Sequence, residues 1–547
     1  MKKILLSLSL AAAAVLAAAQ DYTDALLLSE SNYYGTARSV AMGNAFTALG
    51  GDLGSIGINP AGSAVNNYSQ FTFSPGISIS GISSNYNPAP AAGDAGKTTG
   101  NSWARATMPN IGFTINVSTR NRSGLKNYTM GFIANSTNYY TSDLRASGVN
   151  NTSSYMGYLA AMANDSGLSD EALGGDPLGD VSLWPAQIGF INYIVNSNGT
   201  DYVGIAQENT RDIMGNYPVV TGANLAQSFN RVRKGHKHDY VFNLGFNFSD
   251  MFFIGANLGM VSTRIDQTWS FSEEFPAGRT IEIDNVSYTF KEMQMTQWSV
   301  IDASGFYAKI GVIAVPVPGL RIGAAIQTPT ATVIKEEWNV YGDAWFTGMK
   351  KHADGSESSN IYQYRLTSPF RANFGLAYTL PGLGLLSADY ELVDYSDMRF
   401  KEMRGGEGSF TYANQRSRAF TGVQHNLRIG AEARLGQLVS LRAGYNLKTS
   451  PEYARYDANG NYMDPYSYDG TQVLASKEAL KAFTHAVSAG IGYNSTGSFF
   501  CDLALRGTFF PDEYIYPYPT YGAGIDSPEI LSRSRMWDII LTLGWRF

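Results

Sequence analysis

The chain ends in the stretch MWDIILTLGWRF, residues Met536 to Phe547. Its side chains alternate between a mixed set and an apolar set, and the apolar set is Trp537, Ile539, Leu541, Leu543, Trp545 and Phe547. A period of two predicts a β-strand. An apolar face with aromatic residues near both ends is typical of a strand that faces lipid in a transmembrane β-barrel. An edge strand of a soluble β-sandwich is the alternative interpretation.

The same alternation recurs along the chain. Apolar residues occupy every second position from Tyr240 to Phe248, and the pattern resumes at Phe252 after Ser249-Asp250, which predicts a tight hairpin. Further strands are expected to begin near Gln70, Asn110, Asn127, Gly305, Leu320, Pro369, Leu385, Val423, Leu438, Phe483, Phe499 and Met536. These segments predict about fourteen antiparallel strands, an even number within the usual range for such barrels.

The connections between these segments alternate in length. Pro316 to Gly319 and Gly436-Gln437 are short, whereas Tyr139 to Lys237 and Glu337 to Ser368 are long. Short periplasmic turns and long external loops are expected of an outer-membrane barrel, and a soluble β-protein has no reason to alternate them. The sequence therefore predicts an all-β fold, with residues 69–547 forming a transmembrane antiparallel barrel with long extracellular loops.

Composition and the amino terminus agree with an exported membrane protein. The net charge is -6 and only 16% of the residues are charged, so the chain lacks the basic stripe that nucleic-acid binding requires. Residues 1–19 contain two lysines, an apolar run and a closing Ala17-Ala18-Ala19, which predicts a signal peptide cleaved after Ala19. The run is short for a membrane-anchor helix. Because no other long apolar stretch follows, only a closed barrel remains as a way to enter a membrane.

Residues 20–68 do not alternate, and a plug inside the lumen is expected there. This segment is rich in small residues, including Gly43-Asn44 and Gly51-Asp52, and it contains Asn59-Pro60-Ala61 just ahead of the first strand. Small residues at close spacing suit short helices packed in a narrow lumen, and Asn-Pro suits an abrupt turn. The tripeptide alone is a weak signal, because it recurs at Asn87-Pro88-Ala89 in an expected external loop.

With these motifs the chain resembles the FadL/TodX-like family of outer-membrane transporters for long-chain fatty acids and aromatic hydrocarbons. In the barrel the resemblance rests on Val312 to Ala325, Ser368 to Tyr378, Leu386 to Tyr390, Leu427 to Glu432 and Leu441 to Tyr445. It implies a fourteen-stranded barrel whose amino-terminal hatch blocks the lumen. It also implies that an apolar ligand lands between external loops, moves to a deeper pocket and leaves sideways through the wall after the hatch shifts.

The resemblance implies passive uptake of fatty acids or similar lipids and aromatics across the outer membrane. A dry groove can extract such a ligand from water, because each buried CH₂ contributes about 0.8 kcal/mol. The terminal Phe547 also resembles the recognition signal of the barrel assembly machinery, an expected partner. The protein is expected to act as a monomer. A non-transporting adaptor or secretion-complex subunit on the same fold is the alternative function.

Candidate ligand contacts lie in the longest loop and on the inward faces of strands. Met and aromatic residues suit an alkyl chain, and the loop residues are Tyr155, Met156, Leu159, Trp184 and Phe190. The alternative is that they pack the loop onto the barrel rim. A fatty-acid carboxylate calls for a cation, and the inward-facing candidates are Lys309, Arg321, Arg371 and Arg428. In the alternative, structural interpretation, these cations pair with the inward-facing carboxylates Asp389, Glu391 and Glu432.

No cofactor, metal or enzymatic activity is expected. His236 and His238 flank Lys237, but no third ligand follows at a suitable spacing. The stretch Asp457 to Asn461 lacks the later Gly and Glu of a calcium loop, so a plain loop is the better interpretation. A hydrolase is disfavoured because the chain has no G-x-S-x-G motif. The tyrosines between Tyr514 and Tyr521 suit either a ligand contact or an interfacial rim.

Overall fold

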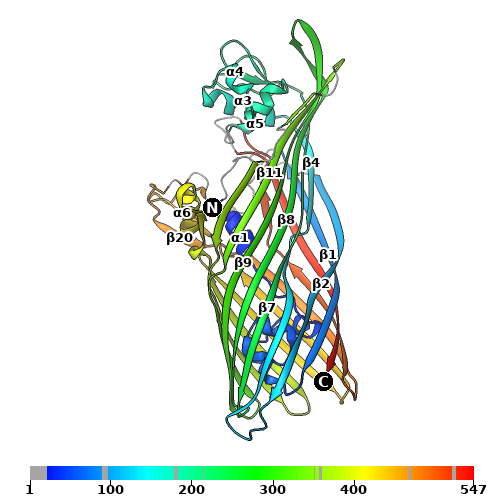
Figure 1. Ribbon diagram of the computed structural model, residues 1–547. Helices are drawn as coiled ribbons and strands as arrows, with labels where there is room; N and C mark the ends of the chain where they lie inside the picture. The colour runs from blue at the N-terminus through cyan, green and yellow to red at the C-terminus, as the bar shows by residue number, and fades with distance from the viewer. Residues whose placement is uncertain are drawn as a thin grey trace.

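The computed structural model describes residues 21–88, 97–177, 183–213, 215–349, 352–355, 360–465, 468, 470–519 and 525–547. The signal peptide expected over residues 1–19 lies outside these residues. Most of the described chain forms one closed, elongated antiparallel barrel, with short helices of the amino-terminal segment inside it (Figure 1). None of the described helices is both long and apolar enough to cross a membrane. The predicted all-β barrel is confirmed.

Fourteen strands of the described chain close the barrel in chain order. They are β1 (Gln70–Asn87), β2 (Lys97–Ser118), β3 (Leu125–Tyr139), β7 (Leu225–Phe248), β8 (Phe252–Ile283), β9 (Val286–Val317), β10 (Leu320–Gln327), β14 (Arg371–Leu380), β15 (Gly384–Asp394), β17 (Val423–Leu435), β18 (Val439–Thr449), β21 (Phe483–Asn494), β22 (Phe499–Phe509) and β24 (Glu529–Arg546). The last strand pairs with the first from Gln70↔Arg546 to Asn87↔Glu529, which closes the sheet. The tight hairpin at Ser249-Asp250 is also confirmed, with φ 58° at both residues.

Six further strands of the described chain extend this barrel at the end that carries the long loops. They are β4 (Ser142–Asn150), β11 (Ala331–Thr347), β12 (His352–Gly355), β13 (Asn360–Thr367), β16 (Arg399–Glu402) and β23 (Glu513–Ile515). The expected loops from Tyr139 to Lys237 and from Glu337 to Ser368 thus contain strand residues that the sequence did not reveal. Away from lipid both faces of a strand can be polar, so the period of two is lost.

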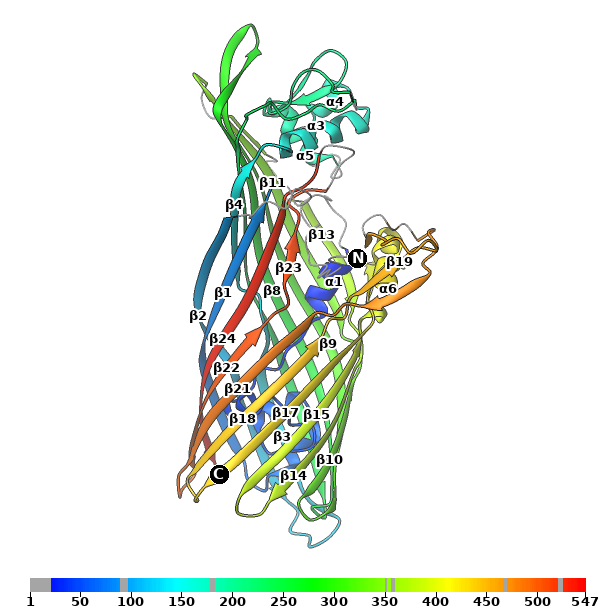
Figure 2. The same cartoon turned by 180° about the vertical axis from the view of Figure 1, so that it is seen from behind.

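The barrel wall is much taller on one side than on the other, as Figures 1 and 2 show. Strands β8 and β9 have 32 residues each, whereas β15, β18 and β22 have 11. The outward side chains Phe252, Ile254, Leu258 and Met260 of β8 are between 40% and 68% exposed. Further along the same outward face, Arg264 forms ion pairs with Asp266 at 3.3 Å and Asp302 at 2.9 Å. The apolar outer band therefore ends before Arg264, and the rest of the hairpin projects beyond it.

Four α-helices, two 3₁₀-helices and two hairpins of the described chain lie at the long-loop end. The cap subdomain, residues 151–224, contains α3 (Tyr155–Ser166), α4 (Asp170–Leu173), α5 (Trp184–Ile191) and the hairpin of β5 (Val195–Ser197) and β6 (Tyr202–Gly204). A second group contains η4 (Tyr395–Asp397), η5 (Gly408–Phe410), α6 (Thr411–Phe420) and the hairpin of β19 (Tyr453–Tyr456) and β20 (Ser476–Ala479). The cap subdomain lies beside the tall wall, and the second group lies on the short side (Figure 2).

The amino-terminal segment from residue 21 to residue 68, here called the hatch, lies within the lumen (Figure 2). It contains α1 (Tyr22–Ser29), α2 (Ala37–Ala41), η1 (Leu53–Gly57) and η2 (Pro60–Val65). Glycines on the inner wall allow its backbone to approach closely, because a Cβ at any of them would lie within 2.7 Å of a hatch atom. These glycines are Gly245, Gly255, Gly311, Gly323, Gly375, Gly430, Gly444 and Gly490. At these glycines the hatch therefore lies in direct contact with the wall.

Candidate functional site

The aromatic and Met residues of the longest loop form the core of the cap subdomain. Tyr155, Met156, Leu159 and Trp184 are completely buried, and Phe190 packs partly buried against the same cluster. The ring of Tyr155 contacts the rings of Phe271 and Tyr518 at centroid distances of 5.2 and 5.4 Å. In this conformation these loop residues therefore pack the loop onto the barrel rim, which was the alternative interpretation. Tyr518 belongs to the same core, and Tyr521 lies outside the described residues.

The cap subdomain is attached to β8 through Glu273, a residue that the sequence did not single out. Its carboxylate accepts hydrogen bonds from the Ser154 hydroxyl at 2.6 Å and from the backbone N–H groups of Tyr155 at 2.8 Å and Met156 at 3.3 Å. Anionic groups stabilise a helix amino terminus because the first N–H groups lack intrahelical partners. A buried carboxylate thus holds the start of α3 on the tall wall.

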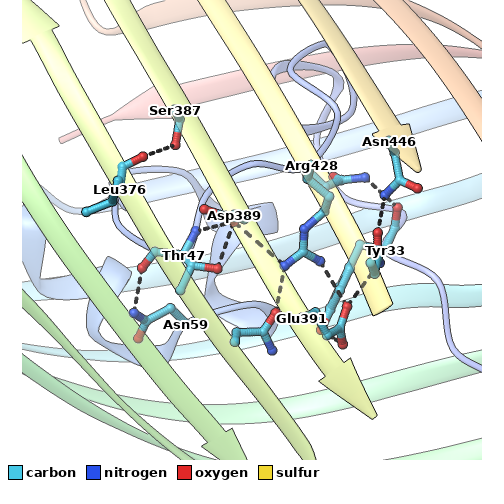
Figure 3. Close-up of polar contacts among 12 residues, drawn as sticks. Tyr33, Thr47, Asn59, Leu376, Ser387, Asp389, Glu391, Arg428 and Asn446 are labelled. Atoms are coloured by element: carbon cyan, nitrogen blue, oxygen red, sulfur yellow. Dashed lines mark hydrogen bonds and ion pairs between the residues drawn. The ribbon is translucent and has the colours of Figure 1, made fainter. Parts of the chain in front are cut away.

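Two of the four predicted cations, Arg371 and Arg428, belong to a buried ion network between the wall and the hatch, and Figure 3 shows its members Arg428, Asp389 and Glu391. Arg428 lies 3.1 Å from Glu391 and 3.7 Å from Asp389, and Arg371 lies 3.5 Å from Glu391. Asp389 in turn accepts hydrogen bonds from the backbone N–H and the hydroxyl of Thr47, both at 2.7 Å. Lys309 donates to the carbonyl of Gly57 at 2.6 Å. The structure therefore agrees with the interpretation that these cations pair with groups of the protein itself. Some of these partners belong to the hatch.

The predicted hatch residues form hydrogen bonds within the hatch and to the wall. Asp52 accepts hydrogen bonds from the Gly54 N–H at 2.8 Å and the Thr36 hydroxyl at 2.7 Å, and so caps η1. Asn59 caps η2 through the Ala61 N–H at 3.1 Å. These are roles that Asp and Asn commonly play at helix starts.

Asn59 also links the hatch to the wall. Its amide donates to the carbonyl of Thr47 at 2.6 Å and to that of Val312 in β9 at 3.1 Å. Pro60 and Ala61 are buried against Gly255. Gly43 and Asn44 both have positive φ, and the Asn44 amide donates to the Tyr33 carbonyl at 2.9 Å. Gly51 also has positive φ and receives the Asn66 amide on its carbonyl at 3.1 Å.

Helix α1 fills an apolar chamber in the upper lumen, here called the α1 chamber. Ala25 and Leu28 are buried there and Leu26 and Leu27 are partly buried. The chamber walls are Tyr140, Ile265, Ile301, Ile334, Tyr364, Leu366, Val393, Tyr395, Met398, Phe400 and Phe410. The sequence did not reveal this site, although Asp21 followed by an apolar run is a usual sign of a capped helix.

Cations from the wall surround the carboxyl end of α1. Lys237 donates to the carbonyls of Leu28 and Glu30, both at 2.8 Å, and Arg371 donates to the carbonyl of Ser29 at 2.8 Å. Lys448 binds the Glu30 carboxylate. The carbonyls at a helix carboxyl end carry partial negative charge. The α1 chamber therefore combines an apolar body with a cationic end.

The wall is interrupted next to this chamber, between β2 and β3. Their ladder runs from Ser118↔Asn127 only to Asn110↔Asn135, although β2 continues to Lys97 paired with β1 alone. Beyond that point side chains replace the backbone ladder: Ser136 donates to the Met108 carbonyl at 2.9 Å, and Arg105 donates to the Gly235 carbonyl at 2.7 Å. The hatch lies against this edge, because the Asn32 N–H donates to the Thr137 carbonyl at 2.7 Å.

The remaining candidates lie apart from the chamber. Arg321 lies on the other side of the hatch and donates to the Leu49 carbonyl. His236 and His238 have ring centroids 4.7 Å apart, and the described residues contain no group of three or more His, Cys, Asp or Glu that could hold a metal. Asp457 accepts hydrogen bonds from the backbone N–H groups of Asn459 and Asn461, as in an ordinary polar turn.

Comparison with known proteins shows which solved structures share this fold. No protein-family model and no curated protein matches the chain. The chain is similar to the solved structure of a Pseudomonas aeruginosa FadL homologue, at 13% identity and a TM-score of 0.50 over 94% of this chain and 98% of that one. It is also similar to the Pseudomonas putida toluene transporter TodX, at 11% identity and a TM-score of 0.49 over 94% and 99%. The resemblance to the FadL/TodX-like proteins is thus confirmed for the fold: this chain is a fourteen-stranded barrel with the architecture of a FadL homologue.

Proposed function

We propose that the protein lies in the outer membrane and takes up hydrophobic small molecules passively, with long-chain fatty acids or similar lipids and aromatics as its ligands. The α1 chamber is the observation that carries this proposal. An aromatic-lined apolar space with a cationic end suits a molecule with an apolar tail and an anionic head. In the described conformation α1 occupies that space, so a ligand enters only when the hatch moves.

The wall interruption supports a sideways exit. Delivery into lipid avoids returning the apolar surface of the ligand to water. The side-chain contacts of Arg105 and Ser136 can break and reform without disturbing a backbone ladder, and the hatch residue Asn32 is bonded to the same edge. Movement of the hatch and opening of the wall are therefore coupled in this proposal.

Uptake with a cross-linked hatch tests the mechanism. The hydroxyls of Ser63 in the hatch and Thr129 in β3 lie 2.8 Å apart, so S63C/T129C offers a disulfide from hatch to wall. The matched control is S74C/T542C, which joins β1 to β24 at a hydroxyl distance of 2.7 Å. Both pairs are made with C501S, since Cys501 is the one native cysteine.

Cells that lack the gene and cells that express each variant are given labelled oleate and labelled toluene. We expect uptake to be lost in oxidised S63C/T129C, restored by reductant, and retained in S74C/T542C. Undiminished uptake with the hatch cross-linked would refute hatch movement. If the unmodified protein transports none of several apolar ligands, the adaptor function replaces the transport proposal.

A further inference from the structure

A cavity of about 830 Å³ lies on the other side of the hatch from the α1 chamber. Hatch residues Leu49 to Asp52 form its roof, and the turns at Gly382, Gly436 and Asn494 form its rim. Because these turns are the short ones, the cavity faces the side that is expected to be periplasmic. We call it the turn-side cavity.

The turn-side cavity has more cations than anions. Five guanidinium groups line it, from Arg38, Arg321, Arg434, Arg442 and Arg546, against three carboxylates from Asp52, Glu432 and Asp502. Glu432 pairs with Arg38 at 3.0 Å and with Arg442 at 2.7 Å, and Arg442 also pairs with Asp502 at 2.5 Å. These contacts use two of the arginines and leave three without a carboxylate partner in the described part of the chain.

The three remaining guanidinium groups have incomplete partners. Arg546 donates to the Asn494 side chain at 2.9 Å and stacks on Phe500 at 4.6 Å, but its Nε is buried with no hydrogen-bond partner among the described residues. Arg321 donates to the Leu49 carbonyl, and Arg434 is exposed at the rim. A buried donor without a partner costs free energy, and a planar guanidinium matches an oxyanion through two parallel hydrogen bonds.

We propose that the turn-side cavity is a binding site for an oxyanion, a carboxylate or phosphate group that enters from the periplasmic side. Arg321 of β10 and Arg434 of β17 bind it, whereas Arg546 of β24 lies on the opposite side of the barrel from Arg321 and is not part of this pair. The Leu49 carbonyl that Arg321 now holds precedes Gly50 and Gly51, which form a tight turn of the hatch with φ of 63° and 74°. An oxyanion competes for that guanidinium and so frees the hatch turn. The site thus couples the contents of the periplasm to the hatch, whatever molecule is transported.

Calorimetric titration of the whole purified protein in zwitterionic detergent tests the site, with inorganic phosphate and acetate as separate probes. R321Q/R434Q removes two cavity arginines. R120Q/R122Q removes two arginines from the turn between β2 and β3, outside the cavity, and is the matched control. We expect binding to the unmodified protein and to the control, and about tenfold weaker binding to R321Q/R434Q, which corresponds to about 1.4 kcal/mol, because charge-assisted hydrogen bonds to the anion are lost.

Each outcome bears on the proposal. Binding of phosphate alone assigns the site to phosphate head groups, and binding of acetate alone assigns it to carboxylates. Equal affinity in the two double variants, or no binding to the unmodified protein, would overturn the site.

Hydrogen exchange of residues 47–54 tests the coupling between the site and the hatch. The anion should raise the exchange rate in the unmodified protein, and R321Q should show a raised exchange rate without the anion. Anion binding with unchanged exchange would overturn the coupling. Gel mobility before and after heating shows that each variant is folded.

Discussion

Single residues on the inner wall determine how closely the hatch can approach. Gly255 is the clearest case, because a Cβ there would lie 2.3 Å from the Pro60 carbonyl carbon and 2.4 Å from the Ala61 nitrogen. Both are backbone atoms and cannot rotate away. Inward glycines would weaken a strand of a soluble sheet, but Gly255, Gly323, Gly430 and Gly444 are positions where the hatch backbone touches the wall.

Substitution of Gly255 by Ala is expected to displace η2 from the wall at a cost of about 1–3 kcal/mol, the usual cost of overpacking. Hydrogen exchange of residues 58–66 should rise, while the barrel remains folded by its gel mobility. G100A is the control, because nothing lies within 4 Å of a Cβ at Gly100. Equal exchange in the two variants would contradict the close-contact explanation.

The carboxyl group of a single loop residue, Glu452, should make the stability of its loop depend on pH. Burial, together with the nearby Glu513 carboxylate, raises the pKa of Glu452 from 4.5 to about 8. A raised pKa means that the folded loop binds the proton more tightly than the unfolded loop. Its stabilising effect is therefore complete below pH 4.5 and is lost as the pH rises through about 8.

Proteolysis of the loop from Ser450 to Lys481 should accordingly become faster between these two pH values. E452Q should remove this dependence, whereas E478Q, which changes an exposed glutamate of the same loop, should retain it. Identical pH profiles for the unmodified protein and E452Q would show that another group is responsible.

At the scale of elements, one strand residue determines the position of a helix. Glu273 in β8 binds the first N–H groups of α3, and Gln227 of β7 also donates to it. Its neighbour Glu274 points to the opposite face and is exposed. Glu273 thus attaches the cap subdomain to one face of the extended hairpin, in addition to the packing of its apolar core.

E273A is expected to loosen the cap subdomain, because unpaired buried N–H groups cost about 1–3 kcal/mol. Protease added to intact cells should cleave residues 151–224 faster in E273A than in E274A. If transported ligands enter beneath this subdomain, the initial uptake rate should change in E273A alone. Equal cleavage of the two variants would show that the packed aromatic core suffices for attachment.

At the scale of the whole molecule, the unequal height of the wall and the break between β2 and β3 give the barrel a direction. Successive hatch residues from α1 to Tyr34 contact three features of the wall. These are the α1 chamber, the ion network and the interrupted ladder. A ligand that displaces α1 therefore meets the break before it meets the periplasmic turns.

A photo-reactive benzoylphenylalanine tests this path. Placed at Met108, beside the break, it should cross-link to a labelled fatty acid during uptake. Placed at Leu386, on the continuous ladder between β14 and β15, it should label only at the background level of free fatty acid in lipid. Cross-linking at both positions to the same extent would argue against a sideways exit at the break.

The sequence by itself determined the barrel. Residues such as Ile539, Leu541 and Leu543 alternate because lipid contacts only one face of a strand, and that pattern is local and can be read from the chain. The same reasoning gave the hairpin at Ser249-Asp250 and the strand starts at Gln70, Leu320, Val423, Phe483 and Phe499. The starts predicted near Asn110, Tyr240, Gly305 and Met536 were wrong, because β2, β7, β9 and β24 begin at Lys97, Leu225, Val286 and Glu529, where the strands extend beyond the apolar band and the period of two is lost. It also marked the amino-terminal segment as non-strand, because Gly43 to Asp52 lack any alternation.

Only the tertiary structure decided which residues contact one another inside the lumen. Lys309, Arg371 and Arg428 could be placed inside the lumen from the sequence, but their partners Gly57, Ser29 and Glu391 come from distant segments. No local pattern records which pairs meet across a closed barrel. The α1 chamber, the separate place of Arg321 and the break beside Met108 follow from strand register and hatch position, which depend on contacts between residues far apart in the chain.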